Sequence, residues 1–172
     1  MNSVNIQRMS RLGYHHGALA EALVDVAVGQ VRAQGSERVT LRGVAQAVGV
    51  SPSAAYNHFA DKDALLAAVA LRGQAELDRR ITAAADAGGD DDAAAIARLR
   101  AIAGVYIGFA HDDPNLFRHA FGPYLMDGHS DTTSSQAYET LNRTLDDLDE
   151  RGLLRPGLLF WRDSQWAPCW RT

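Results

Sequence analysis

Residues 40–62 read TLRGVAQAVGVSPSAAYNHFADK, and this stretch decides the fold of the chain. Its first part places apolar side chains at the three- and four-residue spacing of one helix face, which ends at Val48. Gly49 is suited to end that helix, since glycine adopts the left-handed backbone conformation without steric cost. A second helix is expected to begin at once, because Ser51 can cap it and Pro52 lacks the N–H that would otherwise stay unbonded. Two helices joined by so tight a turn predict a helix-turn-helix, whose second helix can enter the major groove of DNA.

The stretch carries a dense motif, made of Thr40, Val44, Ala45, Val48, Gly49, Val50, Ser51, Ala55, Tyr56, His58, Phe59, Lys62 and Leu65. Through these residues the chain resembles the DNA-binding domain of the TetR family of transcriptional regulators. Weaker similarity runs back through residues 20–35, and residues 106–123 resemble a C-terminal domain found in some members of that family. The resemblance implies a regulator, most often a repressor, that binds DNA through its amino-terminal domain.

The start of the second helix has the short side chains that a recognition helix needs if its backbone is to approach the bases. Ser51, Pro52, Ser53 and Ala54 meet this need. Ser53 can exchange a hydrogen bond with a base edge, and Ala54 can contact a thymine methyl group. The alternative for Ser51 is a purely structural role as the helix cap.

Further DNA contacts follow from the resemblance. Tyr56 and His58 correspond to positions whose side chains reach phosphates, and Lys62 to the usual backbone-contacting lysine. Thr40 and Arg42, at the start of the first motif helix, are also expected at the phosphate backbone, with Arg42 able to reach a base. Such contacts fix the register on DNA and supply most of the salt-dependent affinity. The structural alternatives are a partly buried Tyr56 and an ordinary surface histidine at position 58.

The charge distribution agrees with a DNA partner. Residues 1–80 hold nine Lys or Arg and seven Asp or Glu, whereas residues 81–172 hold eight and fourteen. The whole chain is acidic, with a formal net charge of −4, but its basic half is the half with the helix-turn-helix. A protein that is acidic overall can bind DNA when its basic groups gather on one face.

Nothing in the sequence indicates an enzyme, a cofactor or a metal site. There is no Gly-rich phosphate loop or nucleophile elbow, and neighbouring histidines such as His15 and His16 point about 100° apart on a helix and rarely share a metal. The single cysteine, Cys169, cannot form an internal disulfide. No apolar run approaches the roughly 20 residues that span a membrane, and no signal-peptide layout is present. We therefore expect a cytoplasmic protein with no catalytic residues and no membrane partner.

Helical periodicity recurs along the chain and no strand pattern appears, so an all-α fold is expected. A helix-turn-helix DNA-binding domain is expected over residues 13–60, and a C-terminal helical effector-binding and dimerisation domain over residues 61–172. Residues 1–12 are expected to be disordered. Asp61 or Asp63 is expected to cap the fourth helix, and Asp113 the sixth. The helices are expected at 16–33, 41–48, 52–59, 62–84, 93–110, 114–121 and 134–151.

An aromatic set in the C-terminal domain is a candidate effector pocket, because ligand sites between helices favour aromatic walls with a few polar groups. The alternative is that aromatics at helical spacing form the core. The candidate residues are Tyr106, Phe109, Phe117, His119, Phe121 and Tyr124.

The expected partners are double-stranded DNA with a palindromic operator, an unidentified small-molecule effector and a second copy of the chain. The last twenty residues, which hold Trp161, Trp166 and Trp170, do not match the family and are too few for its two long dimerising helices. Either the dimer uses helix 134–151 and this tail, or the C-terminal end is truncated or altered. The competing hypothesis is therefore a helical interaction module that keeps the helix-turn-helix but dimerises poorly.

Overall fold

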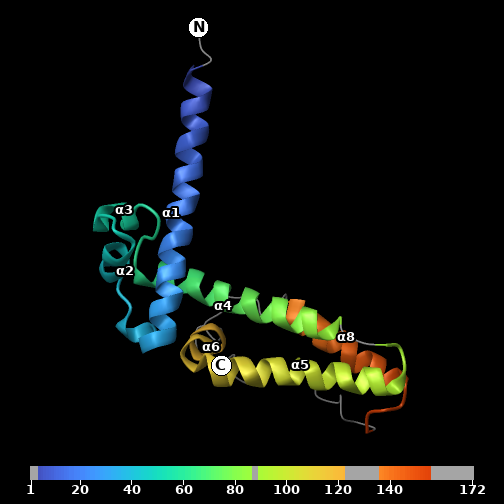
Figure 1. The fold of residues 1–172 in the computed structure, drawn as a ribbon. Helices are drawn as coiled ribbons and strands as arrows, with labels where there is room; N and C mark the ends of the chain where they lie inside the picture. The colour runs from blue at the N-terminus through green and yellow to red at the C-terminus, as the bar shows by residue number, and fades with distance from the viewer. Residues whose placement is uncertain (1–3, 87–88, 123–135, 156–172) are drawn as a thin grey trace, which may run out of the picture.

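The computed structural model describes residues 4–86, 89–122 and 136–155, with side chains from Gly17 onward. Every regular element in these ranges is helical, so the predicted all-α fold is confirmed (Figure 1). The elements are α1 (Val4–Gln34), the 3₁₀ turn η1 (Ser36–Arg38), α2 (Leu41–Val48), α3 (Pro52–Tyr56), α4 (Lys62–Ala85), α5 (Asp92–Asp112), α6 (Pro114–Phe121) and α8 (Gln136–Glu150). Residues 156–172, which hold the three tryptophans, and Tyr124 lie outside the described residues.

The first helix is longer than the sequence suggested. We expected disorder over residues 1–12 and a helix from residue 16, but α1 begins at Val4. Residues 4–12 contain neither glycine nor proline. A helix nucleated over the packed part of α1 can therefore propagate through them, because each further residue adds a hydrogen bond. Figure 1 shows this amino-terminal part projecting past α2 and α3 with no other described element beside it.

The third helix is shorter than expected and ends at Tyr56 rather than at Phe59. The chain leaves α3 through a turn in which the N–H groups of His58 and Phe59 both donate to the carbonyl of Ala55, each at 3.0 Å. This turn places Phe59 against the hydrophobic core, as its apolar character suggested. The short turn η1 between α1 and α2 was not expected.

The amino-terminal core is shared by α1, η1, α2, α3 and the first turns of α4. Its fully buried apolar side chains are Leu23, Ala27, Val31, Val39, Val44, Ala45, Ala55, Leu65 and Val69. α4 continues from this core into the carboxyl-terminal half, where it packs against α5, α6 and α8. The expected domain boundary at residue 60 thus falls at the start of a helix that serves both halves.

In the carboxyl-terminal half, α4, α5 and α8 pack together lengthwise, and α6 lies at the end of this group nearest α1 (Figure 1). The approach of α6 to α4 is very close at Gly73. A Cβ atom built on that glycine would lie 2.9 Å from the Cβ of Ala120 and 3.3 Å from Leu116 Cδ1. The face of α6 that holds these two side chains therefore rests directly on the backbone of α4.

Arg151 joins the end of α8 to the beginning of α5. Its Nε donates to Asp147 Oδ1 at 2.7 Å, and its terminal nitrogens reach Asp90 Oδ1 at 3.0 Å and Asp92 Oδ1 at 3.3 Å. The hydrogen bond from Arg151, aided by the positive charges of Arg151 and Arg98, lowers the pKa of the Asp147 carboxyl. Asp147 therefore stays ionised to lower pH in the folded protein than in an unfolded chain.

One helix, α5, bears on the expectation that the protein has no membrane partner. By length and composition this helix could cross a membrane, with a mean hydropathy of 1.4 over its most apolar window. Two arginines, Arg98 and Arg100, interrupt it, and it packs against α4, α6 and α8. Only 17% of the window is buried, and Tyr106 and Ile107 are 45% and 66% exposed. α5 therefore packs on the bundle with one side and leaves an apolar outer side exposed. Nothing else in the described residues indicates membrane insertion.

Candidate DNA-binding surface and ligand cavity

The turn between α2 and α3 is built by local hydrogen bonds. Gly49 has φ 83° and ψ 28°, the left-handed conformation that the sequence predicted. The N–H of Gly49 donates to the carbonyl of Gln46 at 3.1 Å, and the N–H of Val50 to that of Ala45 at 3.0 Å. These paired bonds form a Schellman motif, which satisfies the last carbonyls of α2. The direction in which α3 leaves the turn is therefore fixed by a few residues.

Side-chain caps begin all three helices around this turn. Ser51 Oγ accepts from Ala54 N at 3.2 Å at the start of α3, where Pro52 occupies the first helical position. Thr40 Oγ1 accepts from Gly43 N at 3.1 Å at the start of α2. Asp61, rather than Asp63, caps α4. Ser51 thus caps α3, and its hydroxyl can still donate a hydrogen bond outward.

The predicted DNA-contacting residues lie on the outside of the amino-terminal half. Ala55 is the one buried residue of α3 and holds it to the core, so the rest of the helix faces outward to varying degrees. Tyr56 is 46% exposed, which leaves much of its ring accessible rather than packed in the core. Exposed residues of the set are Thr40, Arg42, Ser51, Pro52, Ser53 and Tyr56, and partly buried ones are Ala54, His58 and Lys62.

Lys62 has an intramolecular partner. Its Nζ donates to the backbone carbonyl of Glu37 in η1 at 2.8 Å. The bond ties the start of α4 to the connection before α2. A contact between this lysine and a phosphate would compete with that bond or share the ammonium group with it, since an ammonium has three donors.

A cavity of about 670 Å³ opens between α4, α5 and α8, with the end of α6 at its edge. The size is in the range of sites for small organic ligands. Most of its lining is aliphatic or aromatic. The lining residues are Leu71, Gln74, Ala75, Leu77, Asp78, Ile81, Leu99, Ile102, Ala103, Tyr106, Ile107, Phe121, Ala137, Tyr138 and Leu141.

The aromatic set predicted from the sequence is divided by the structure. Tyr106 and Phe121 line the cavity, whereas Phe109 is 1% exposed and belongs to the core. Phe117 packs edge-on against Tyr106 and Phe109, with ring centroids 5.2 and 6.2 Å apart respectively. His119 is buried away from the cavity, and its Nε2 lies 2.8 Å from the carbonyl oxygen of Leu66. The aromatics therefore form one wall of the cavity and the core behind it.

Sequence reasoning missed two polar groups of the cavity, both of which come from α4. Gln74 Nε2 donates to the carbonyl of Ala120 in α6 at 3.0 Å. Asp78 Oδ1 accepts from the N–H of Ala137 near the start of α8 at 3.1 Å. Among the described residues that line the cavity, Asp78 is the one charged side chain. The described residues contain no cluster of histidine, cysteine, aspartate and glutamate side chains that could hold a metal ion. The sequence did carry a signal for these two groups, because Gln74 and Asp78 are four residues apart and therefore lie on one face of α4.

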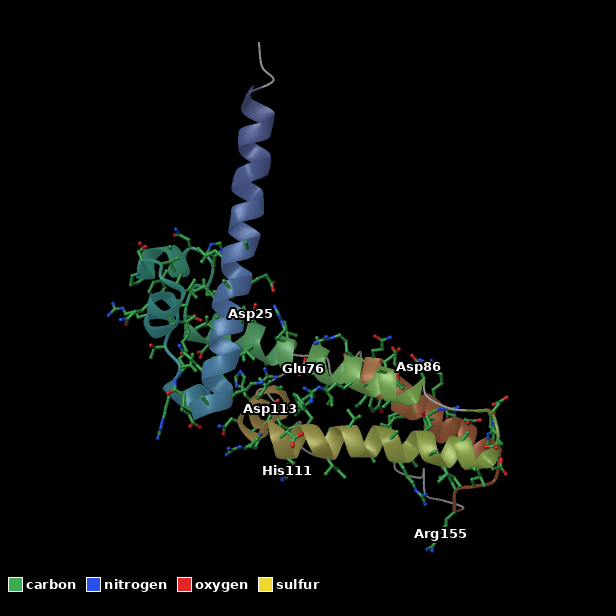
Figure 2. All side chains as sticks on the ribbon, viewed as in Figure 1. Asp25, Glu76, Asp86, His111, Asp113 and Arg155 are labelled. Carbon is green, nitrogen blue, oxygen red and sulfur yellow. The ribbon has the colours of Figure 1, made fainter. Side chains whose placement is uncertain are left out.

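A polar junction links the end of α1 to α4 and α6. Arg32 pairs with Glu76 of α4 at 2.8 Å and, through Nε, with Asp113 at 3.1 Å. Asn115 Nδ2 in α6 donates to the carbonyl of Arg32 at 3.0 Å. The prediction that Asp113 caps α6 is wrong, because its side chain makes no cap bond and faces Arg32 instead. Figure 2 shows Glu76 and Asp113 where α1 approaches α4 and α6.

Comparison with known proteins gives similarity in sequence and in fold. Residues 23–69, from α1 to the first turns of α4, match the family model for bacterial regulatory proteins of the tetR family. A protein of unknown function from Rhodococcus sp. RHA1 shares 30% sequence identity and a TM-score of 0.63, with 84% of this chain and 74% of that chain covered. The TetR family transcriptional regulator PfmR from Thermus thermophilus is similar in fold, with 19% identity, a TM-score of 0.58, and 86% and 88% of the two chains covered. A search of curated proteins found no match.

Proposed function

We propose that this chain is a transcriptional repressor of the TetR family, whose model residues 23–69 match. In this proposal it is cytoplasmic, binds a palindromic operator as a homodimer and is released by a small apolar effector. The observation that carries the proposal is the turn from Gly49 to Ser51. It holds α2 and α3 in a helix-turn-helix and leaves the start of α3 exposed. We propose no catalytic role.

In the proposed complex, α3 enters the major groove with its first turn toward the bases. Ser53 and Ala54 then read base edges, since their short side chains allow a close approach. The flanking phosphates are held by Thr40, Tyr56, His58 and Lys62. Arg42 contributes a phosphate contact and can reach a base from the start of α2.

A palindromic operator requires two copies of α3 related by a twofold axis and about one helical turn of DNA apart. A dimer gains affinity because binding of one half-site makes binding of the second intramolecular. The carboxyl-terminal half is the proposed pairing region. A protein that kept the helix-turn-helix but stayed monomeric would bind single half-sites weakly, which is the behaviour expected of an interaction module.

The proposed effector is an apolar molecule without negative charge. Its site is the cavity between α4, α5 and α8, with Tyr106 and Tyr138 as hydrogen-bonding groups among apolar walls. Asp78 would repel a carboxylate or phosphate, and the described lining holds no arginine or lysine to compensate. An anionic ligand would therefore lose its hydration with no ion pair in return.

Contacts within the protein offer a route from this cavity to the DNA-binding half. A ligand beside Gln74 disturbs its bond to Ala120, and with it the position of α6. α6 in turn holds the end of α1 through Asn115 and Arg32. Coupling between two sites of this kind is typically about 1–3 kcal/mol, or roughly 5- to 150-fold in affinity.

Selection of bound sequences from random DNA by the full chain tests the DNA-binding proposal. We expect an inverted repeat whose half-sites lie one helical turn apart. Analytical ultracentrifugation of the same preparation, with and without the selected DNA, then separates a dimer from a monomer. Enrichment of single half-sites by a monomeric protein would support the interaction module instead, and no enrichment would refute sequence-specific binding.

A pair of matched variants tests the effector site. Ala103→Phe fills the cavity from α5, whereas Ala97→Phe adds the same bulk to an exposed position of α5 outside the lining. A thermal-shift screen of neutral and cationic apolar compounds identifies a ligand that operator DNA antagonises. We expect Ala103→Phe to abolish that thermal shift and Ala97→Phe to keep it. Equal shifts in both variants would place the ligand elsewhere.

A further inference from the structure

One cation of the DNA-binding half has neither a partner in the fold nor a role in the proposed complex. Residues 17–72 contain five Lys or Arg. Two of them, Arg32 and Arg72, form ion pairs with acids of neighbouring elements. Two others are among the proposed DNA contacts. The fifth is Arg38, the last residue of η1.

The guanidinium group of Arg38 is available to a ligand. The side chain is exposed, and it forms no ion pair or hydrogen bond with any described residue. The acid next to it in the sequence, Glu37, is exposed as well. A 3₁₀ turn has three residues per turn, so neighbouring side chains point about 120° apart. The carboxylate of Glu37 and the guanidinium of Arg38 therefore leave η1 on different sides.

The backbone that follows Arg38 sets the direction of its side chain. Val39 has φ −72° and ψ 136°, and Thr40 has φ −132° and ψ 143°, so this short connection is extended. Alternate side chains of an extended chain point to the same side. Val39 and Leu41 are buried, at 0% and 3% exposure, and point into the core. Arg38 and Thr40 therefore both leave on the outer side, about 7 Å apart along the chain.

Lys62 comes to the same place from α4. Its Nζ donates to the carbonyl of Glu37 at 2.8 Å, and that carbonyl belongs to the peptide bond between Glu37 and Arg38. The ammonium group thus lies beside the backbone of Arg38. Thr40 Oγ1 accepts from Gly43 N, and its O–H remains able to donate to a phosphate oxygen. Two cations and a hydroxyl donor therefore gather at the connection between α1 and α2.

We propose that Arg38 binds the DNA backbone at a phosphate neighbouring those held by Thr40 and Lys62. Phosphates of one strand follow each other at about 3.4 Å along the helix axis, so a group about 7 Å from Thr40 reaches a neighbouring phosphate. A planar guanidinium group can donate to two phosphate oxygens at once. The inference rests on the proposed function and adds to it one contact that reads no base.

The test compares Arg38→Ala with Arg79→Ala in the full chain, because both variants lose one exposed arginine. Arg79 also forms no ion pair with a described residue, but it lies about 25 Å beyond Lys62 along α4, at 1.5 Å per residue. Figure 1 shows α4 leading away from α2 and α3 in this direction. A third variant, Arg38→Lys, keeps the charge. Affinities for the selected operator and for a random duplex are measured over a range of salt concentrations, and ethylation interference identifies the contacted phosphates.

We expect Arg38→Ala to weaken binding to both duplexes by the same factor, since the contact reads no base. Its salt slope should be shallower by about 0.9 for each bound copy of the chain, and interference should disappear at one phosphate of each half-site. Arg79→Ala and Arg38→Lys should keep the slope and the interference pattern of the unmodified chain. If Arg38→Ala has the same slope as Arg79→Ala, the inference is overturned while the proposed function stands. If the unmodified chain selects no DNA, both fail together.

Discussion

The contact between α4 and α6 leads to a measurable difference between two glycines that both lie inside helices. Gly73→Ala places a Cβ atom 2.9 Å from Ala120 Cβ, a distance that requires α6 to move. Gly104→Ala, in α5, meets no atom within 4 Å. The two substitutions make the same chemical change in opposite surroundings, so each is the control for the other.

The expected magnitudes follow from two opposing effects. Replacing a helical glycine by alanine stabilises the helix by about 1 kcal/mol, and at Gly104 this effect acts alone. Overpacking a core usually costs about 1–3 kcal/mol, and at Gly73 this cost opposes the gain. α6 has little freedom to withdraw, since Asn115 and His119 bind it to Arg32 and Leu66. We therefore expect Gly104→Ala to stabilise the protein, and Gly73→Ala to be less stable than it by about 1–3 kcal/mol.

Urea unfolding followed by far-ultraviolet circular dichroism measures both free energies under the same conditions. The slope of free energy against urea should be the same for the two variants, so the midpoints can be compared directly. Equal stabilisation by both alanines would refute the reasoning, because it would mean that α6 does not rest on the backbone of α4 at Gly73.

Three further changes have defined outcomes. Ser51→Ala removes the cap bond to Ala54 N and should lower the free energy of unfolding by about 1 kcal/mol; an unchanged urea midpoint would contradict this. Arg42→Ala should weaken binding to every DNA sequence and reduce the salt slope by about one unit, and a titration with an unchanged slope would exclude it as a phosphate contact. The bond from Arg151 lowers the pKa of Asp147 below its usual 3.8, so its contribution to stability is present above about pH 4 and is lost as the pH falls through the lowered pKa. The Asp147→Asn variant should therefore lose less stability than the unmodified protein as the pH falls through this range. Acid unfolding curves that run parallel for the two proteins would argue against this role of Asp147.

The helix-turn-helix could be predicted because its determinants are local. Gly49 ends α2 through its own backbone conformation, and Ser51 with Pro52 begins α3 through contacts within four residues. The bounds of α2 were accordingly predicted correctly. Where a distant partner competes, local reasoning failed. Asp113 precedes a proline and reads as a helix cap, but Arg32 of α1 takes its carboxylate instead.

The cavity could be predicted only in part, because its lining depends on how helices far apart in the sequence pack. Tyr106 and Phe109 are three residues apart on α5 and look equivalent in the sequence. One lines the cavity and the other is buried in the core, although both rings pack against Phe117 of α6. The polar groups Gln74 and Asp78 were missed for the same reason, because their partners are Ala120 of α6 and Ala137 of α8.

Because α3 is held to the core by a single buried residue, its outer surface can change easily during evolution. Only Ala55 of its five residues is buried, so the core constrains one position of the helix. Mutations at Ser53 or Tyr56 alter the outward surface without opening a cavity in the core. A gene duplicate could therefore drift to a new operator by single steps, each leaving a folded protein for selection to act on.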